Sequence, residues 1–272
     1  MKKIEGALYL FCFARADLVG ELEGTGVDGH HPLFVLRGSP DLGAVVSEVR
    51  LEDFCGPVAE LRMQDLAWVG PRAFRHEAVV EQVMRHSPVL PARFGTLFSS
   101  QESLAEFLAT HRKTISQFLE RVADQEEWSI KGLLDRKQAL QALMSGSLAA
   151  QQVQLAALPP GTRYFQEQRI RSAAEKELSR WLNETCRQVA SDMRKQASDF
   201  RECQVVPREP PESGTEVVLN WAFLLPRSAT TAFRLRIDRV NETHATPGLV
   251  FELSGPWPPY RFVPPLSMGT AP

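Results

Sequence analysis

The chain has 272 residues, of which 43% are hydrophobic and 24% are charged. These values are ordinary for globular proteins and argue against a disordered or fibrous chain. The 31 basic and 33 acidic residues give a formal net charge of -2, so no excess of positive charge attracts nucleic acid or an anionic lipid membrane. A chain of this length is long for one hydrophobic core, and two domains are expected.

An N-terminal α+β domain, a small mixed α/β sheet domain, is predicted over residues 1–98. The run from Ala7 to Ala14 is almost continuously apolar, which is typical of a central strand covered on both faces. It is too short to span a bilayer and follows Glu5, so we interpret it as a strand and not as a signal peptide. The segments Leu33–Leu36 and Ala44–Val49 are further strands, separated by turn residues.

A helix is predicted from Pro71 to about Arg85, because proline is favoured at the first helical position. Residues 89–98 then form an edge or bent strand, since Pro91 cannot donate a ladder hydrogen bond and Gly95 permits a bulge. The inward side of the helix is expected to carry residues at spacings of three and four, namely Ala73, His76, Val80, Val83 and Met84.

A connecting helix is predicted over residues 99–126. Ser99 and Glu102 have the spacing of a capping box, in which each side chain bonds the backbone of the other residue. Apolar residues then recur at helical spacing through Val122, which makes the helix amphipathic.

The second domain is predicted over residues 127–263, followed by a flexible end at residues 264–272. Its elements run strand, helix, strand, strand, helix, strand, the order of a ferredoxin-like split βαβ sandwich. The strands are expected at Trp128–Asp135, Cys203–Pro207, Glu216–Leu225 and Gly248–Ser254. The helices are a helical region at about residues 136–156, a long helix that begins after Pro159–Gly161 and runs to about Phe200, and a helix capped by Ser228.

No motif predicts catalysis, a cofactor or a metal. Residues 24–29 match GxGxxG, but no buried strand precedes them and no helix follows, so a flexible loop is the preferred interpretation. His76 and Glu77 do not form an HExxH motif, and His76 is interpreted as a hydrogen-bonded core histidine. The cysteines form no CxxC pair and are interpreted as reduced thiols of a cytosolic protein. We therefore expect no enzyme.

Two apolar features are candidates for protein interaction. The strand from Val217 to Leu225 is apolar on both sides of its pleat, which singles out Trp221 and Phe223. The tail combines polyproline-like geometry with aromatic rings, at Trp257, Pro258, Pro259 and Tyr260. The preferred interpretation is that Trp257 and Tyr260 pack back onto the protein's own sheet as a terminal clasp, and a direct partner site is the alternative.

Four separated motifs resemble those of the gas vesicle protein F/L family, in the same order and spacing. They begin at Gly70 (GPRAFRHEAVV), Pro91 (PARFGTLFSS), Glu127 (EWSIK) and Leu253 (LSGPWPPY), and the resemblance extends from about residue 7 to about residue 263. It implies two α+β domains and no enzyme activity.

The resemblance also implies an accessory protein needed for gas vesicle assembly. Such a protein would bind the main shell protein, either as a minor shell component or as a chaperone-like factor, and would contact other accessory proteins in the cytoplasm at the gas vesicle. A shell subunit is apolar on its gas-facing side, so before assembly it needs cover against aggregation. The alternative is a small-ligand-binding protein or enzyme on a ferredoxin-like scaffold, a fold that hosts many functions.

Overall fold

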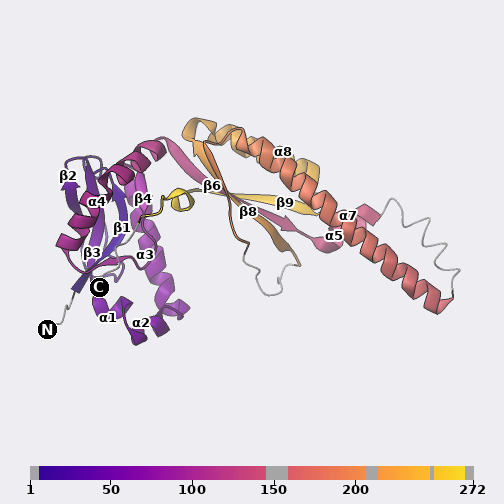
Figure 1. The fold of residues 1–272 in the computed structure, drawn as a ribbon, viewed down its shortest axis with the longest axis horizontal. Coiled ribbons are helices and arrows are strands. Elements are labelled where there is room, and N and C mark those ends of the chain that lie inside the picture. Colours follow the sequence, from indigo (N-terminus) through magenta and orange to yellow (C-terminus); the bar gives the residue numbers. More distant parts are fainter. Residues whose placement is uncertain (1–5, 145–158, 206–213, 246–247, 267–272) are drawn as a thin grey trace. The chain divides into compact units, whose positions relative to one another are not determined.

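The structure, a computed structural model, describes residues 6–144, 159–205, 214–245 and 248–266 (Figure 1). The chain forms two compact units. The first unit comprises the residues up to Glu126 together with those from Pro256 onward, and the second comprises Glu127–Gly255. The mixed α+β class is therefore as predicted, and each unit is built on its own sheet.

The sheet of the first unit has the strand order β2-β3-β1-β4, with β5 also paired to β1. Its strands are β1 (Gly6–Ala14), β2 (Leu33–Ser39), β3 (Leu42–Arg50), β4 (Val89–Pro91) and β5 (Leu97–Phe98). β1 is antiparallel to β3, β4 and β5. The single bent strand predicted over residues 89–98 is two short strands, because a turn between Arg93 and Thr96 interrupts the pairing.

The two faces of β1 are both buried, as its continuous apolar run predicts. Tyr9 and Phe11 point into a cluster with the valines of α3 (Leu66–Met84), and both are 0% exposed. On the other face Phe13 stacks on Phe107 of α4 (Gln101–Val122), with ring centroids 5.8 Å apart. Leu90 of β4 is also buried. Aromatic stacking of this kind contributes beyond the area it buries.

Helix α3 begins at Leu66, five residues earlier than predicted, and contains Pro71 in its interior. Asp65 caps it, because its side chain accepts a hydrogen bond from the N–H of Ala67 at 2.9 Å. The cap stabilises the first turn of α3, which precedes Pro71. Pro71 has no backbone N–H, so it removes only one hydrogen-bond donor from the helix. Two short helices that were not predicted precede it, α1 (Leu51–Phe54) and α2 (Pro57–Arg62).

Helix α4 is part of the first unit and not a connecting helix, because it buries an apolar face against this sheet. Its cap also differs from the prediction: Ser100, not Ser99, forms a capping box, and Ser103 takes the place expected for Glu102. The buried side chains of α4 recur at helical spacing and are Leu104, Phe107, Leu108, Ile115, Phe118, Leu119 and Val122.

The sheet of the second unit has the strand order β7-β8-β6-β9. Its strands are β6 (Gln125–Leu134), β7 (Asp199–Glu202), β8 (Glu216–Pro226) and β9 (Leu249–Trp257), and β7 is antiparallel to β8. The second strand was predicted at Cys203–Pro207, several residues too late. The long helix ends at Arg194 and not near Phe200, so Phe200 pairs with Phe223 in the sheet.

The helices of the second unit are α5 (Arg136–Met144), α7 (Pro160–Arg194) and α8 (Thr230–His244). Phe233 of α8 packs on Phe223 with ring centroids 5.1 Å apart, and Leu178 and Met193 of α7 join the same cluster. Ser228 does not cap α8; it lies in the 3-10 turn η1 (Arg227–Ala229). Of the predicted helical region 136–156, residues 145–156 lie outside the described residues.

In the part of the chain that the structure describes, no helix is both long and apolar enough to cross a membrane.

Candidate functional site

Trp221 and Phe223, two of the predicted partner-binding residues, lie in the core of the second unit. They are 6% and 0% exposed, and both belong to the cluster beneath α7 and α8. These two side chains of β8 therefore pack within the second unit. Their direct contact with a partner protein stays a prediction.

The tail residues predicted for interaction pack in the first unit, with one exception. Pro258 and Pro259 are buried, and the Tyr260 hydroxyl donates a 2.9 Å hydrogen bond to Glu77 Oε2 of α3. Tyr260 begins the short turn η2 (Tyr260–Phe262), while Trp257 remains 39% exposed. The Tyr260 hydroxyl thus holds the tail on α3 of the first unit, whereas the sequence predicted a clasp of Trp257 and Tyr260 onto the protein's own sheet.

The end of the described tail is fixed to α4 as well. The Arg121 guanidinium donates a 2.9 Å hydrogen bond to the carbonyl oxygen of Phe262, whose side chain is 2% exposed. A charged donor, a buried ring and the Tyr260 hydrogen bond together make the tail an integral part of the first unit.

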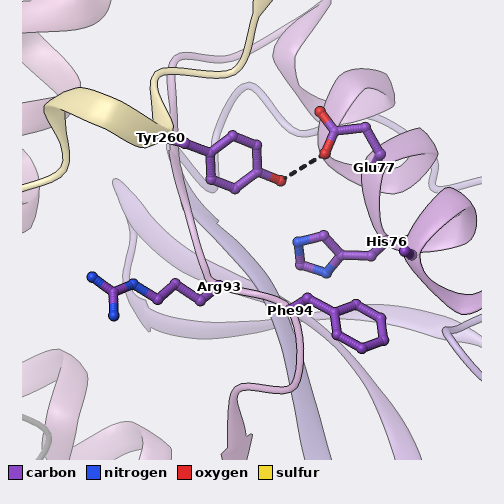
Figure 2. A pocket seen from close by; sticks show the side chains of 6 residues that line it. His76, Glu77, Arg93, Phe94 and Tyr260 are labelled. Carbon is purple, nitrogen blue, oxygen red and sulfur yellow. Dashed lines mark hydrogen bonds between the residues drawn. The ribbon is translucent and has the colours of Figure 1, made fainter. Parts of the chain in front are cut away.

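A pocket of about 310 Å³ lies where the tail meets α3. Figure 2 shows Tyr260 and Glu77 on one side of the His76 ring, and Arg93 and Phe94 on the other. These residues come from three separate parts of the chain: α3, the loop between β4 and β5, and η2. Together with Ala73 they form the whole lining, which combines aromatic walls with a carboxylate, an imidazole and a guanidinium.

His76 is held in the pocket by a hydrogen-bond chain that starts at the backbone. The Gly95 N–H donates to the Tyr9 hydroxyl oxygen at 3.1 Å, and the hydroxyl lies 2.9 Å from His76 Nδ1. Gly95 has φ +82°, a conformation that glycine adopts without strain, and this presents its N–H to Tyr9. The prediction of a hydrogen-bonded core histidine is thus confirmed at Nδ1.

Burial sets the charge state of His76. It lowers the pKa of the imidazole to about 4, and the Ala92 backbone offsets this only in part. The ring is therefore neutral near pH 7 and can donate one hydrogen bond and accept another. Burial also raises the pKa of the Tyr9 hydroxyl, so this group stays protonated.

Glu77 is half-buried next to His76. Burial raises the pKa of its carboxyl, and the hydrogen bond from Tyr260 opposes that rise. The Tyr260 pKa is itself raised by burial and by the neighbouring Glu77 charge, so Tyr260 acts as a donor. Two coupled groups with shifted pKa values in one pocket are a recognised mark of a functional site.

A second candidate surface lies on α2 and α3, where large apolar side chains face solvent. Leu66 is 83% exposed, Phe74 is 76% exposed and Leu61 is 70% exposed. Leu66, Gly70 and Phe74 are spaced by four residues and so lie along one side of α3. We call Val58, Leu61, Met63, Leu66 and Phe74 the α2–α3 apolar surface; each is more than 40% exposed.

Sequence reasoning missed this surface because Pro71 was interpreted as the helix start, which left Leu66 outside any helix. It missed the pocket because Arg93 and Tyr260 are distant from His76 in sequence. The one available signal was the adjacent pair His76 and Glu77 on the inward side of a helix.

The GxGxxG match has no nucleotide-site geometry. The loop closes on itself through Gly26 N–H to the His31 carbonyl oxygen, and Asp28 accepts hydrogen bonds from the N–H groups of His30 and His31. Strand β2 follows, so no helix N-terminus is presented to a phosphate. Among the described residues, no cluster of three or more His, Cys, Asp or Glu side chains could hold a metal ion.

Comparison with known proteins gives consistent matches. Residues 7–264 match the family "Gas vesicle synthesis protein GvpL/GvpF". A gas vesicle protein L of Streptomyces sp. (strain CB03234) is 26% identical over 242 residues, which cover 87% of this chain and 85% of that protein. A gas vesicle protein F of Dolichospermum flosaquae is 23% identical, over 71% of this chain and 77% of that protein.

Two crystal structures share the fold. The gas vesicle protein GvpF of Anabaena sp. PCC7120 superposes with a TM-score of 0.67 at 19% identity, covering 95% of this chain and 96% of that one. GvpF of Microcystis aeruginosa superposes with a TM-score of 0.65 at 18% identity, covering 95% and 99%. Since the family match covers nearly the whole sequence, the chain belongs to the gas vesicle synthesis protein GvpL/GvpF family.

Proposed function

We propose that the protein is a non-catalytic accessory factor of gas vesicle assembly that binds the main shell protein. The family membership supports a role connected with gas vesicles. The observation that carries the binding role is the α2–α3 apolar surface, where five large apolar side chains are exposed within 17 residues of sequence, from Val58 to Phe74. Exposed apolar patches on a protein surface mark sites of association.

The chemistry of the two partners is complementary. A shell subunit that faces gas on one side is strongly apolar there, and this side must be covered before assembly. Complete burial of one leucine or phenylalanine side chain contributes about 1.5–3 kcal/mol. Leu66 and Phe74 expose most of their surface, so the pair can supply several kcal/mol to a complex.

The same proposal includes a cytoplasmic location at the gas vesicle and contacts with other accessory proteins. The proposal includes two alternatives: the protein is a minor component of the shell, or it is a transient chaperone of the shell protein. A shell component stays with washed, intact vesicles, whereas a chaperone is recovered mainly in the soluble fraction.

We also infer that the second unit is a ferredoxin-like split βαβ domain. The strand order β7-β8-β6-β9 supports this, together with α7 between β6 and β7 and α8 between β8 and β9. The same fold in other proteins hosts enzymes and ligand-binding domains. The pocket described above lies in the first unit, so it gives no support to a catalytic site on this scaffold.

The test is co-expression with the main shell protein, scoring the complex in a pull-down and the amount of shell protein that stays soluble. The double variant Leu66→Ser, Phe74→Ser removes the apolar side chains from α3 without removing core packing. The matched control is Leu235→Ser, Phe165→Ser, which changes a leucine and a phenylalanine that are 53% and 71% exposed on other helices. We expect loss of binding only for the α3 pair.

Equal binding by the two double variants would show that the α2–α3 apolar surface is not the contact. Absence of binding by the wild-type protein, with a shell protein competent to form vesicles, would reject the shell-binding function itself.

A further inference from the structure

Two arginines in the GPRAFRHEAVV motif of α3 have no role in the core of the first unit. His76, Val79 and Val80 of the same motif are buried. Arg72 and Arg75 are partly exposed and are spaced by three residues, so they lie on the same side of the helix. Both guanidinium groups donate to backbone carbonyl oxygens, and neither forms an ion pair with any residue that the structure describes.

The Arg72 side chain is held in place by Trp68, one turn earlier on α3. Its guanidinium carbon lies 4.1 Å from the centre of the Trp68 ring, and Nη1 donates a 3.0 Å hydrogen bond to the Trp68 carbonyl oxygen. Nε is buried, whereas Nη2 makes no hydrogen bond to the described residues and stays accessible to solvent. A guanidinium fixed by stacking loses little side-chain entropy when it binds an anion.

The Arg75 side chain is positioned by the loop that precedes β2. Its guanidinium carbon packs against Gly29, where an added Cβ would lie 3.1 Å from it. Nη1 donates to the Val27 carbonyl oxygen at 3.4 Å, and the other two nitrogens remain accessible and unbonded within the described part of the chain. The two arginines therefore present N–H donors next to each other at the surface of the first unit.

The carboxylates near these arginines are already occupied. Asp53 and Asp28 interact electrostatically with Arg72. Asp53 accepts hydrogen bonds from two other arginines, and Asp28 accepts them from N–H groups of its own loop. Burial lowers the pKa of Arg72, and the neighbouring charge of Arg75 lowers it further. Positive charge is thus crowded here, and an additional carboxylate would relieve it.

The two arginines border the α2–α3 apolar surface. Phe74, which is 76% exposed, lies between them in the sequence. Successive residues of a helix point about 100° apart around its axis, so Phe74 and Arg75 lie on adjacent sides of α3. A segment that covers Phe74 and Leu66 therefore reaches the guanidinium groups along one of its own sides.

We propose that the partner segment that covers the α2–α3 apolar surface is acidic along one side, and that its carboxylates bind Arg72 and Arg75. Arginine and carboxylate groups have matching hydrogen-bond geometry. A basic segment would be repelled, and an uncharged one would leave both guanidinium groups without a partner. The inference rests on the proposed function, because it concerns the surface that the proposed function assigns to partner binding.

The test measures the binding of three labelled peptides to the full-length protein by fluorescence anisotropy. The peptides are alanine-based helices of about 16 residues with leucines along one side. They differ only beside the leucines, where they carry glutamate, glutamine or lysine. At low salt we expect the glutamate peptide to bind about fivefold more tightly than the glutamine peptide, as two exposed ion pairs allow, and the lysine peptide to bind most weakly. High salt should remove this preference.

Variants test whether the two arginines cause the preference. Arg72→Gln, Arg75→Gln should bind the glutamate and glutamine peptides equally. The matched control, Arg171→Gln, Arg187→Gln, removes the same charge from two exposed arginines of α7 and should keep the preference. Because Arg72 packs on Trp68, the single variant Arg75→Gln is measured as well, and it should lower the preference to about twofold.

A second double variant separates the apolar contact from the charged contact. Leu66→Ser, Phe74→Ser should weaken the binding of all three peptides and keep their order. The proposal is rejected if no peptide binds, if the lysine peptide binds as tightly as the glutamate peptide, or if the double arginine variant keeps the preference. It is also rejected if the α7 control loses the preference equally, because net charge would then explain the effect.

Failure of shell binding gives a different result from failure of this inference. A glutamate preference that depends on Arg72 and Arg75, together with no binding of the shell protein in the pull-down, would support the acidic-segment site and exclude the shell protein as its partner. Binding of the shell protein without any glutamate preference among the peptides would leave shell binding intact and reject the carboxylate contacts.

Discussion

The buried imidazole of His76 should make the stability of the first unit depend on pH. Its pKa is about 4 in the folded protein and 6.5 in an ordinary environment. Both states are neutral well above pH 6.5, so the full stability is present there. As the pH falls from about 6.5 to about 4, the unfolded chain takes up the proton first and the folded state loses stability.

The magnitude follows from the pKa difference. Each pKa unit corresponds to about 1.4 kcal/mol, so His76 should cost the folded state about 3 kcal/mol by pH 4. No strong discount for solvent screening applies, because His76 is 3% exposed. Glu77, whose pKa is raised by burial, acts in the opposite direction, since the folded state binds its proton at higher pH than the unfolded chain does.

The assay is urea unfolding at several pH values between about 7 and about 4, for the wild type and for His76→Asn. Asparagine keeps an acceptor for the Tyr9 hydroxyl near the position of Nδ1 but does not titrate. Glu77 is present in both proteins, so its contribution cancels when the two pH profiles are subtracted. The wild type should lose about 3 kcal/mol more than the variant over this range.

Identical pH profiles for the two proteins would refute the reasoning. So would an NMR titration of the His76 ring in the folded protein with a midpoint near 6.5, because the ring would then bind its proton without a penalty from burial.

Four further predictions concern stability and are checked by chemical unfolding. Gly132→Ala should destabilise the second unit by about 1–3 kcal/mol, because its Cβ would lie 2.7 Å from Leu219 Cγ; no loss would mean that the leucine moves aside freely. Gly70→Ala should instead stabilise by about 0.5–1 kcal/mol, since it lies inside α3 with no atom within 4 Å of the new Cβ. Ser100→Ala should cost about 1 kcal/mol through loss of the α4 capping box, and an unchanged midpoint would contradict that role. Tyr260→Phe should cost about 1.5–3 kcal/mol, because it removes the hydroxyl bonded to a carboxylate of α3, and an unchanged stability of the first unit would contradict the clasp.

Elements with strong local patterns were predictable from the sequence. The unbroken apolar run of β1 indicates a strand covered on both faces, and the structure buries it between α3 and α4. The apolar spacing of α4 likewise predicts a helix. The spacing does not show which part of the protein the apolar face of α4 packs against. The sequence therefore predicts a connecting helix, whereas α4 packs on the sheet of the first unit.

Element ends and long-range contacts were less predictable, for identifiable reasons. Pro71 is a strong signal for a helix start, but Asp65, six residues earlier, caps α3 and outweighs that signal. The pocket depends on Tyr9, Arg93 and Tyr260 meeting at His76, and no local pattern encodes contacts across such separations. Exposure is also a tertiary property: Trp221 looked like a contact residue and is buried, whereas Phe74 is exposed.

The first unit is discontinuous in sequence, which has a consequence for synthesis on the ribosome. Tyr260 and Phe262, which hold α3 and α4 in the folded unit, are translated after every residue of the second unit. Domains usually fold in the order in which they emerge. Here the second unit can fold first. The pocket of the first unit is complete only after Tyr260, which lines it, has been synthesised. Premature termination after Gly255 would therefore spare the second unit and leave the first one incomplete.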